Sequence, residues 1–153
     1  MNANKFLDVS QVCCRSKFGV NFEYVIQDEP RGIPECFLLC ENFIDNNPTC
    51  LILGDNIFFG QSFAPILKNM SNMKHGANLF SYPVNNPEDF GVIVLDDKKN
   101  PIAIEEKPKN PKSNLALTGL YFYDKNVIEY AKSLSLSSRN ELEISDLNNI
   151  YLK

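Results

Sequence analysis

The sequence contains few of the residues that build metal clusters and nucleophilic active sites. It has one histidine, His75, and its five cysteines form no Cys-x-x-Cys pair. A zinc site is therefore not expected, because structural zinc needs closely spaced cysteine and histidine ligands. No serine–base or cysteine–base pair emerges, and no Gly-x-x-x-x-Gly-Lys-Ser/Thr phosphate-binding loop occurs. We expect all five cysteines to be thiols without a catalytic role.

Long apolar runs and an excess of positive charge are also missing. No stretch approaches the length of a membrane span, and Met1–Lys5 is not followed by the apolar core of a signal peptide. We therefore expect a cytoplasmic protein without a membrane partner. The 15 Lys and Arg residues are outnumbered by 19 Asp and Glu, which gives a net charge of −4. This balance argues against non-specific binding of nucleic acid.

Short apolar runs alternate with segments of helical spacing over most of the 153 residues, of which 44% are hydrophobic. This is enough for one domain with a substantial core. The later strands favour antiparallel pairing, so we expect a mixed sheet in a three-layer α/β domain. Strands are predicted over residues 22–26, 50–53, 78–83, 91–95, 101–106 and 118–123, and helices over 35–43, 62–73, 126–133 and 143–152.

The predicted strand that ends at Leu53 is followed directly by Gly54, Asp55 and Asn56. In open α/β sheets, ligands bind beyond the carboxyl ends of strands, so this position places a carboxylate at the lip of a cleft. Asp55 suits Mg²⁺, a hard cation that takes oxygen ligands and bridges to phosphates. The same residues also start ordinary turns, and the sequence alone leaves that alternative open.

Two further strand ends carry residues suited to a ligand. Glu106 and Lys107 offer a carboxylate and an ammonium group, and Pro108 follows them. Neighbouring strand residues point to opposite faces, so both reach one ligand only if the strand bends, which the proline favours. Gly91 begins another strand and permits a close approach of the backbone to a ligand. An exposed charged strand end and an ordinary strand entry are the alternatives.

Arg139 lies just before the last predicted helix. From there its planar guanidinium can bind a phosphate through two parallel hydrogen bonds. Glu143 and Asp146 suit the first turn of the helix, where acidic side chains interact favourably with the helix dipole. A solvated helix start without a ligand is the alternative. His75 lies at a predicted helix end, where a histidine needs no function, and we discard it as a catalytic base.

Taken in chain order, these segments resemble the bacterial glucose-1-phosphate thymidylyltransferases, a family of nucleotide-sugar pyrophosphorylases. The resemblance implies a nucleotide-diphospho-sugar transferase fold, which is a three-layer α/β/α domain with a Rossmann-like mixed sheet, here incomplete. It also implies transfer of a thymidylyl group from dTTP to glucose 1-phosphate, with release of pyrophosphate, in dTDP-rhamnose biosynthesis. The resemblance extends from about Phe18 to Lys153 and rests on Leu53–Phe58, Phe90–Val92, Glu105–Pro108, Thr118–Asp124 and Arg139–Asp146.

The resemblance assigns roles to individual residues through their positions in these motifs. It implies that Asp55 binds Mg²⁺ near the α-phosphate and that Lys107 and Arg139 hold the sugar phosphate. The residues it assigns to substrate binding are Gln27, Pro30 and Gly32 for the thymine base, Gly91 and Glu106 for the sugar hydroxyls, and Leu117 and Tyr121 for the sugar pocket.

Two segments expected of the family do not occur among the 153 residues. The family opens with a Gly-rich Gly-Thr-Arg loop and a lysine that clamp the triphosphate. It also supplies a second metal-binding aspartate in a Trp-Leu-Asp-Thr-Gly segment. We therefore expect a partial nucleotidyltransferase domain over residues 1–153, in which residues 1–17 match poorly. Each lost electrostatic contact commonly costs about 10² in rate, so we expect the chain alone to be weakly active or inactive.

Other readings of the chain stay open. Pro34 removes a backbone N–H near the implied base pocket, which leaves room for a uridylyl- or cytidylyl-transferring relative. Asn140 stands where the family has glycine, which costs about 1 kcal/mol if a positive φ is needed there. A non-catalytic sugar-phosphate-binding or subunit-interaction fragment is the alternative of a different class. Partners other than dTTP and glucose 1-phosphate would then be a second copy or a complementing polypeptide.

Overall fold

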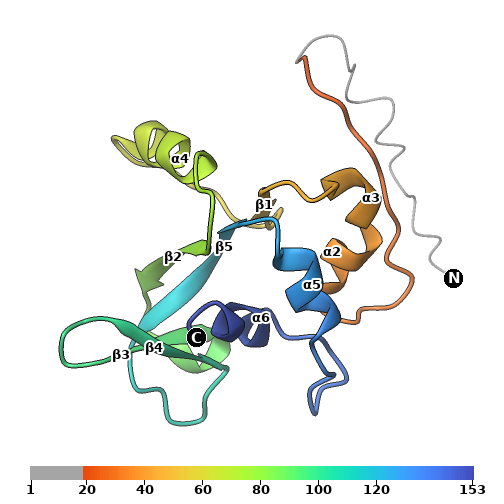
Figure 1. The fold of residues 1–153 in the computed structure, drawn as a ribbon. Coiled ribbons are helices and arrows are strands. Elements are labelled where there is room, and N and C mark those ends of the chain that lie inside the picture. Colours follow the sequence, from red (N-terminus) through yellow and green to blue (C-terminus); the bar gives the residue numbers. More distant parts are fainter. Residues whose placement is uncertain (1–18) are drawn as a thin grey trace, which may run out of the picture.

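A computed structural model describes residues 19–153 of the chain (Figure 1). The α/β class expected from the sequence is confirmed. None of the helices in this part of the chain is long and apolar enough to cross a membrane. The helices are α2 (Glu35–Leu39), α3 (Glu41–Ile44), α4 (Phe63–Ser71), α5 (Val127–Lys132) and α6 (Ile144–Ile150), with a 3₁₀ turn, η2 (Pro87–Asp89). The strands are β1 (Thr49–Ile52), β2 (Ala77–Pro83), β3 (Gly91–Leu95), β4 (Pro101–Glu106) and β5 (Leu115–Tyr123).

The strands form one sheet around β5, and every pairing among the described strands is antiparallel. One edge of β5 is occupied by β2, which pairs with residues 115–117 and 121–123 on either side of an irregularity between Leu79 and Ser81. The other edge is divided between two strands, because β1 pairs with residues 120–123 and β3 pairs with Ala116. Residues 117–119 therefore lie between the ends of β1 and β3 on that edge. β4 adds to β3 as the second strand of a hairpin, as the sequence predicted.

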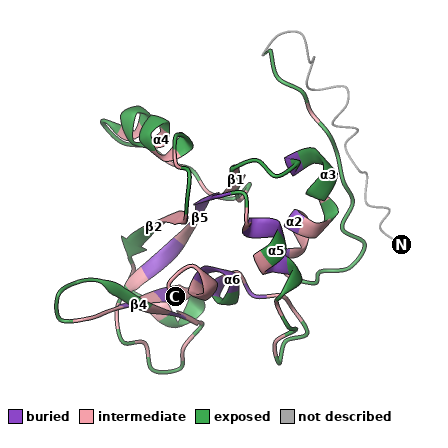
Figure 2. Cartoon of the chain, in the orientation of Figure 1, coloured by how far each residue is buried: buried purple, intermediate pink, exposed green. Residues whose placement is uncertain are grey.

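The hydrophobic core lies where α2, α5 and α6 cover the C-terminal half of β5, and Figure 2 shows buried residues concentrated there. Tyr123 is at its centre. The ring of Phe37 meets the ring of Tyr123 edge-on at a centroid distance of 5.4 Å, a favourable aromatic geometry. The buried Tyr123 hydroxyl donates a hydrogen bond of 2.7 Å to Oδ1 of Asn148 in α6. Helix α6 is thereby fixed against β5 by both apolar and polar contacts.

A second contact fixes α6 against β4. The backbone N–H of Ile104 donates to Oδ1 of Asn149 at 2.8 Å, and Nδ2 of Asn149 donates to the Ile104 carbonyl at 2.7 Å. One side chain thus satisfies both backbone groups of a strand residue, which would otherwise lack a partner on this edge. The pairing fixes α6 along β4, which ends at the predicted site residue Glu106.

Two secondary-structure predictions are wrong in detail. Residues 22–26 do not form a strand, and residues 23–26 are exposed. An alternating segment forms a strand only where it joins a sheet, and the sheet of the described strands does not include this segment. The single helix predicted over 35–43 is interrupted at Cys40, whose φ of −100° and ψ of 14° separate α2 from α3.

The cysteines that the structure describes, Cys36, Cys40 and Cys50, are free thiols as predicted. Cys36 and Cys40 are half-buried and pack against the core, and burial raises the pKa of the Cys36 thiol to about 12. Such a thiol stays protonated at neutral pH and is a poor nucleophile. Cys13 and Cys14 lie outside the described residues, so their role as thiols stays a prediction.

Candidate functional site

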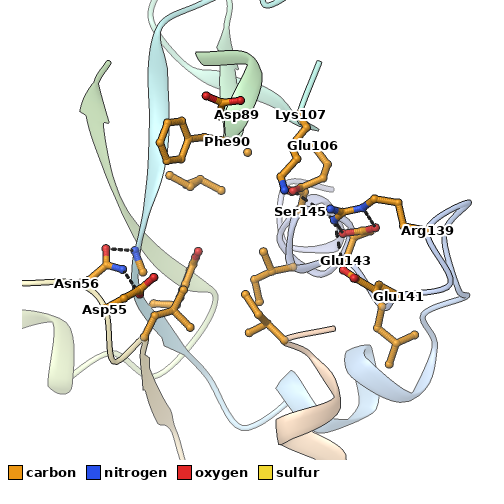
Figure 3. A pocket seen from close by; sticks show the side chains of 18 residues that line it. Asp55, Asn56, Asp89, Phe90, Glu106, Lys107, Arg139, Glu141, Glu143 and Ser145 are labelled. Atoms are coloured by element: carbon orange, nitrogen blue, oxygen red, sulfur yellow. Dashed lines mark hydrogen bonds and ion pairs between the residues drawn. The ribbon is translucent and has the colours of Figure 1, made fainter. Parts of the chain in front are cut away.

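A cavity of about 330 Å³ opens beside β5, at the stretch of its edge between the ends of β1 and β3 (Figure 3). It is built from the loop after β1, the β3–β4 hairpin, β5 and the loop before α6. These segments are far apart in the sequence and meet only in the folded chain. Of the predicted site residues, the cavity is lined by Asp55, Gly91, Glu106, Lys107, Leu117, Tyr121 and Arg139.

The floor of the cavity is one face of β5. Leu117, Gly119 and Tyr121 line it, and their spacing of two residues places these three positions on the same face of the strand. Gly119 leaves space for the loop after β1, because a Cβ there would lie 2.7 Å from both Leu53 Cβ and Asn56 Nδ2. Sequence analysis gave Gly119 no role, although its position inside a strand is a signal of close approach.

At one end of the cavity, Asn56 fixes the carboxylate of Asp55. Nδ2 of Asn56 donates to Oδ1 of Asp55 at 2.8 Å, while Oδ1 of Asn56 accepts the backbone N–H of Gly119 at 3.0 Å. The backbone N–H of Asn56 also donates to the Leu53 carbonyl at 3.2 Å, which closes a turn. The turn and the ligand site are therefore compatible: the turn holds an exposed carboxylate at the rim. Sequence analysis missed this function of Asn56.

At the other end, β4 finishes with the bend that a shared ligand requires. Lys107 has a φ of +42°, in the left-handed region, and its backbone N–H donates to the Phe90 carbonyl at 3.0 Å. The bend interrupts the strand alternation, so Glu106 and Lys107 both line the cavity (Figure 3). Left-handed backbone at a residue other than glycine costs about 1–2 kcal/mol. Such strain is typical of functional sites.

The Glu106 carboxylate is held by Ser145, the second residue of α6. The buried Ser145 hydroxyl donates to Oε2 of Glu106. Gly91 faces this pair, since a Cβ there would lie 2.9 Å from the Ser145 hydroxyl and 3.3 Å from Glu106 Oε2. Burial and the nearby charge of Glu106 raise the pKa of Tyr121 to about 12, so its hydroxyl remains a hydrogen-bond donor at neutral pH. Sequence analysis did not identify Ser145.

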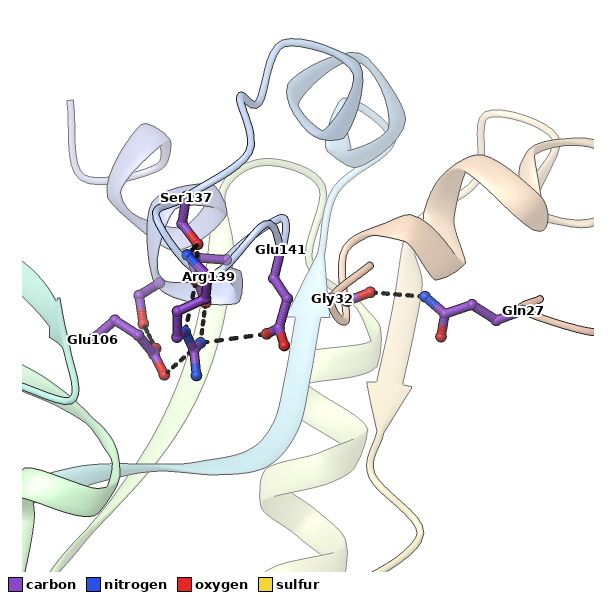
Figure 4. Close-up of polar contacts among 8 residues, drawn as sticks. Gln27, Gly32, Glu106, Ser137, Arg139 and Glu141 are labelled. Atoms are coloured by element: carbon purple, nitrogen blue, oxygen red, sulfur yellow. Dashed lines mark hydrogen bonds and ion pairs between the residues drawn. The ribbon is translucent and has the colours of Figure 1, made fainter. Parts of the chain in front are cut away.

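Arg139 is paired with carboxylates (Figure 4). Its Nε and Nη2 donate to the carboxylate of Glu143 at 3.1 and 2.5 Å. Glu143 is the N-cap residue of α6 and makes no side-chain capping bond, because its carboxylate binds Arg139 instead. Burial acts to raise the pKa of Glu143, but hydrogen bonds from Arg139 and Ser137 and the charges of Arg139 and Lys107 hold it below its ordinary value.

The residues predicted to contact a nucleobase lie outside this cavity. Gln27 and Pro30 are exposed, and Nε2 of Gln27 donates to the Gly32 carbonyl at 3.2 Å and to Oε2 of Glu35 at 2.6 Å. Figure 4 shows Gln27 and Gly32 apart from the group of side chains around Arg139. Gly32 packs directly against the backbone of Leu142, which lines the cavity. None of the three residues predicted to contact the base lines the cavity, and Gly32 adjoins it through Leu142.

The donor set limits how a metal ion is held. In the part of the chain that the structure describes, no group of three or more His, Cys, Asp or Glu side chains is arranged to hold one. Asp55 offers a single accessible carboxylate at the rim. This fits Mg²⁺, which keeps several waters and takes one or two carboxylates together with phosphate oxygens. It does not fit an ion enclosed entirely by protein ligands.

A carboxylate and two cationic side chains lie at opposite ends of the cavity. Asp55 lies at one end, and the cationic groups of Lys107 and Arg139 lie at the other (Figure 3). Between them, Glu106, Tyr121 and the β5 backbone offer acceptors and donors for hydroxyl groups. A polar ligand with an anionic end fits this distribution.

Known proteins of one kind are similar to most of this chain. A glucose-1-phosphate thymidylyltransferase of Neisseria meningitidis is 51% identical over 138 residues, which are 90% of this chain and 48% of that protein. One from Xanthomonas campestris is 44% identical over 137 residues, 90% of this chain and 46% of the relative. The chain therefore spans about half the length of the curated relatives it matches.

Solved structures share the fold. A Bacillus anthracis protein assigned as a glucose-1-phosphate thymidylyltransferase, crystallised with sucrose, superposes with a TM-score of 0.80 at 45% identity. The match covers 94% of this chain and 58% of that one. A UDP-glucose pyrophosphorylase has a TM-score of 0.71 at 24% identity over 84% of this chain and 53% of its own, which supports the fold alone. The model of the nucleotidyl transferase family matches residues 1–153, and the chain belongs to this family.

Proposed function

We propose that the chain carries the sugar-phosphate-binding part of a glucose-1-phosphate thymidylyltransferase. In that reaction, a phosphate oxygen of glucose 1-phosphate attacks the α-phosphorus of dTTP, and the bond to pyrophosphate breaks. The observation that carries the proposal is that the two cations Lys107 and Arg139 line one cavity of about 330 Å³ together with five carboxylates, of which Asp55 is one. Relatives of up to 51% identity that bear this name add support.

Lys107 and Arg139 would bind and orient the phosphate of the sugar. Two cations reduce the repulsion between the phosphate and the carboxylates of the cavity, and the planar guanidinium can hold two oxygens at once. The Glu106 carboxylate would accept hydrogen bonds from the sugar hydroxyls. Gly91 would let the sugar approach the backbone closely. Phosphoryl transfer depends mainly on such positioning and charge neutralisation, so these residues need not react covalently.

Asp55 would be the ligand that this chain contributes to Mg²⁺. When bound, the ion would neutralise charge on the phosphates of dTTP. The base contacts of Gln27, Pro30 and Gly32 stay predictions, and so does the preference for thymine over uracil or cytosine. We also retain two further predictions: a cytoplasmic location, and a second copy or a complementing polypeptide that completes the site.

Thermal unfolding with and without ligand tests the proposal. Glucose 1-phosphate should raise the stability of the chain, because a ligand that binds the folded state stabilises it. dTTP alone should not, because the loop that clamps the triphosphate in the family does not occur among the 153 residues. At a hundred times Kd the gain is about 2.7 kcal/mol, which is roughly 5–10 °C in Tm for a chain of this size. Failure of glucose 1-phosphate to raise Tm at millimolar concentration would contradict the proposed role.

A matched pair of variants locates the binding. Lys107→Ala should remove most of the stabilisation by glucose 1-phosphate, whereas Lys98→Ala should leave it unchanged. Both lysines are exposed at the ends of the β3–β4 hairpin, but only Lys107 lines the cavity. Release of pyrophosphate from dTTP, glucose 1-phosphate and Mg²⁺ should stay far below an ordinary enzyme rate. Turnover near 1 s⁻¹ would show that the expectation of weak activity is wrong.

A further inference from the structure

We propose that Glu143 is a positioning residue, which holds the Nε–Nη2 edge of Arg139 so that the Nη1–Nη2 edge faces the cavity and a phosphate ligand. The inference rests on the proposed function only in naming phosphate as that ligand. The arrangement of the arginine itself is a property of the free chain and can be measured without substrate.

The geometry of the guanidinium gives the two edges different tasks. Its five N–H donors lie in one plane, and a carboxylate or phosphate binds either the Nε–Nη2 edge or the Nη1–Nη2 edge. Glu143 occupies the first edge through bonds of 3.1 and 2.5 Å. Among the residues that the structure describes, none is hydrogen-bonded to Nη1. The second edge is therefore available to a ligand while the first remains bound.

Glu143 is fixed more firmly than the other carboxylates near Arg139. Its side chain is 8% exposed, and its Oε1 also accepts a 2.5 Å hydrogen bond from the Ser137 hydroxyl. The same hydroxyl accepts the backbone N–H of Arg139 at 3.1 Å, which ties the loop to the carboxylate it holds. Asn140 completes this loop with a φ of +61° and an N–H bond of 2.9 Å to the Ser137 carbonyl.

The remaining carboxylates near Arg139 make weaker contacts. Nη2 lies 3.5 Å from an oxygen of Glu106 and 3.5 Å from one of Glu141, and these side chains are 23% and 36% exposed. Contacts of this length are not good hydrogen bonds, and partly exposed ion pairs contribute little. A phosphate can replace them without disturbing the pair of Arg139 with Glu143. Glu143 thus keeps Arg139 in place both before and after a ligand binds.

Nitrogen-15 NMR of the arginine side chains tests this directly. The chain has only three arginines, Arg15, Arg31 and Arg139, so the spectrum contains only three arginine Nε–H signals. The signal that disappears in an Arg139→Lys variant belongs to Arg139. Arg31 is an internal reference, because it makes a similar two-bond pair with Glu29 on the surface, with side chains 56% and 66% exposed. The Arg139 Nε–H should exchange with water at least about tenfold more slowly than that of Arg31.

The decisive variant is Glu143→Gln, and Glu141→Gln is its matched control. Glu143→Gln should abolish the protection of the Arg139 Nε–H and weaken binding of glucose 1-phosphate about tenfold or more. Glu141→Gln should leave the Nε–H protection unchanged. If Glu143→Gln does not fold, Ser137→Ala removes one anchor of Glu143 and should also speed the exchange. Unchanged protection in Glu143→Gln, or in Ser137→Ala where that variant replaces it, would overturn the inference.

The two readouts separate this inference from the proposed function. Protection that depends on Glu143, in a chain that does not bind glucose 1-phosphate, would uphold the arrangement of Arg139 and reject its assigned ligand. Binding that survives in Glu143→Gln at the wild-type affinity would show that Arg139 needs no positioning and would reject the inference alone.

Discussion

Replacing Gly32 with alanine is expected to lower the free energy of unfolding by about 2–6 kcal/mol. Gly32 has a φ of +97°, a region that L-residues rarely adopt, which costs about 1–3 kcal/mol. An added Cβ would also overlap the carbonyl oxygen of Leu142 and lie 2.8 Å from its nitrogen. That nitrogen donates a 2.8 Å hydrogen bond to the Arg31 carbonyl, so neither backbone segment can move freely. Overpacking of this kind costs a further 1–3 kcal/mol or so.

Two other glycines separate the strain from the overlap. Gly76 has a φ of +84° but nothing within 4 Å of an added Cβ, so Gly76→Ala should show the strain alone. Gly60 has an open surrounding and no positive φ, so Gly60→Ala should be nearly neutral. Urea unfolding followed by circular dichroism gives the three values from the midpoints and the common slope. The reasoning fails if Gly32→Ala costs no more than Gly76→Ala.

The result also bears on the role of Gly32. The family resemblance places Gly32 at the nucleobase, while the structure gives it a packing reason to be glycine. A large loss of stability in Gly32→Ala means that its effect on activity cannot be taken as evidence of a nucleotide contact. Gln27 would then be the better residue for testing base recognition, because its side chain is exposed and its hydrogen bonds are local.

Three further outcomes follow from contacts in the sheet and core. Gly119→Ala should cost about 1–3 kcal/mol and release Asn56 from β5, measured by urea unfolding and by loss of amide protection at residue 119. Tyr123→Phe should cost about 1–3 kcal/mol by the same assay, because it leaves the Oδ1 of buried Asn148 unpaired, in addition to its Nδ2, which has no partner among the described residues. Burial acts to raise the pKa of Asp124, but its hydrogen bonds hold it below the ordinary 3.8. The ionised carboxylate of Asp124 therefore contributes its full share of the free energy of unfolding above pH 3.8, and this share is lost as the pH falls through the lower pKa of the folded state. Asp124→Asn should flatten the plot of unfolding free energy against pH below about pH 4.

The sequence predicted those parts of the fold and site that depend on short segments. The bounds of β3 and β4 were predicted correctly, because alternation and a charged turn are local signals. The requirement for a bend between Glu106 and Lys107 followed from strand geometry, and the φ of +42° at Lys107 meets it. Asn140, the substitute for a family glycine, does have a positive φ. Each of these conclusions needed only a few neighbouring residues.

Two of the missed features depend on contacts between distant segments. Asn56 and Gly119 are 63 residues apart, and Glu106 and Ser145 are 39 apart, so no local pattern links the members of either pair. Glu143 was expected to support a helix start, which is the common role of an acidic residue there. Only the folded loop shows that its carboxylate turns back to Arg139.

The divided edge of β5 has a consequence for how the site can change during evolution. The cavity spans the stretch between the β3 pairing at Ala116 and the β1 pairing at Leu120, about 13 Å along an extended strand. Its width is therefore set by sheet register, and it can change only in whole-residue steps of about 3.3 Å. A one-residue slip of β5 against its neighbours would also turn Leu117, Gly119 and Tyr121 to the opposite face. The register of the sheet therefore sets the approximate size of the ligand that fits. Smaller changes in the size of the site must come from side chains on the surrounding loops.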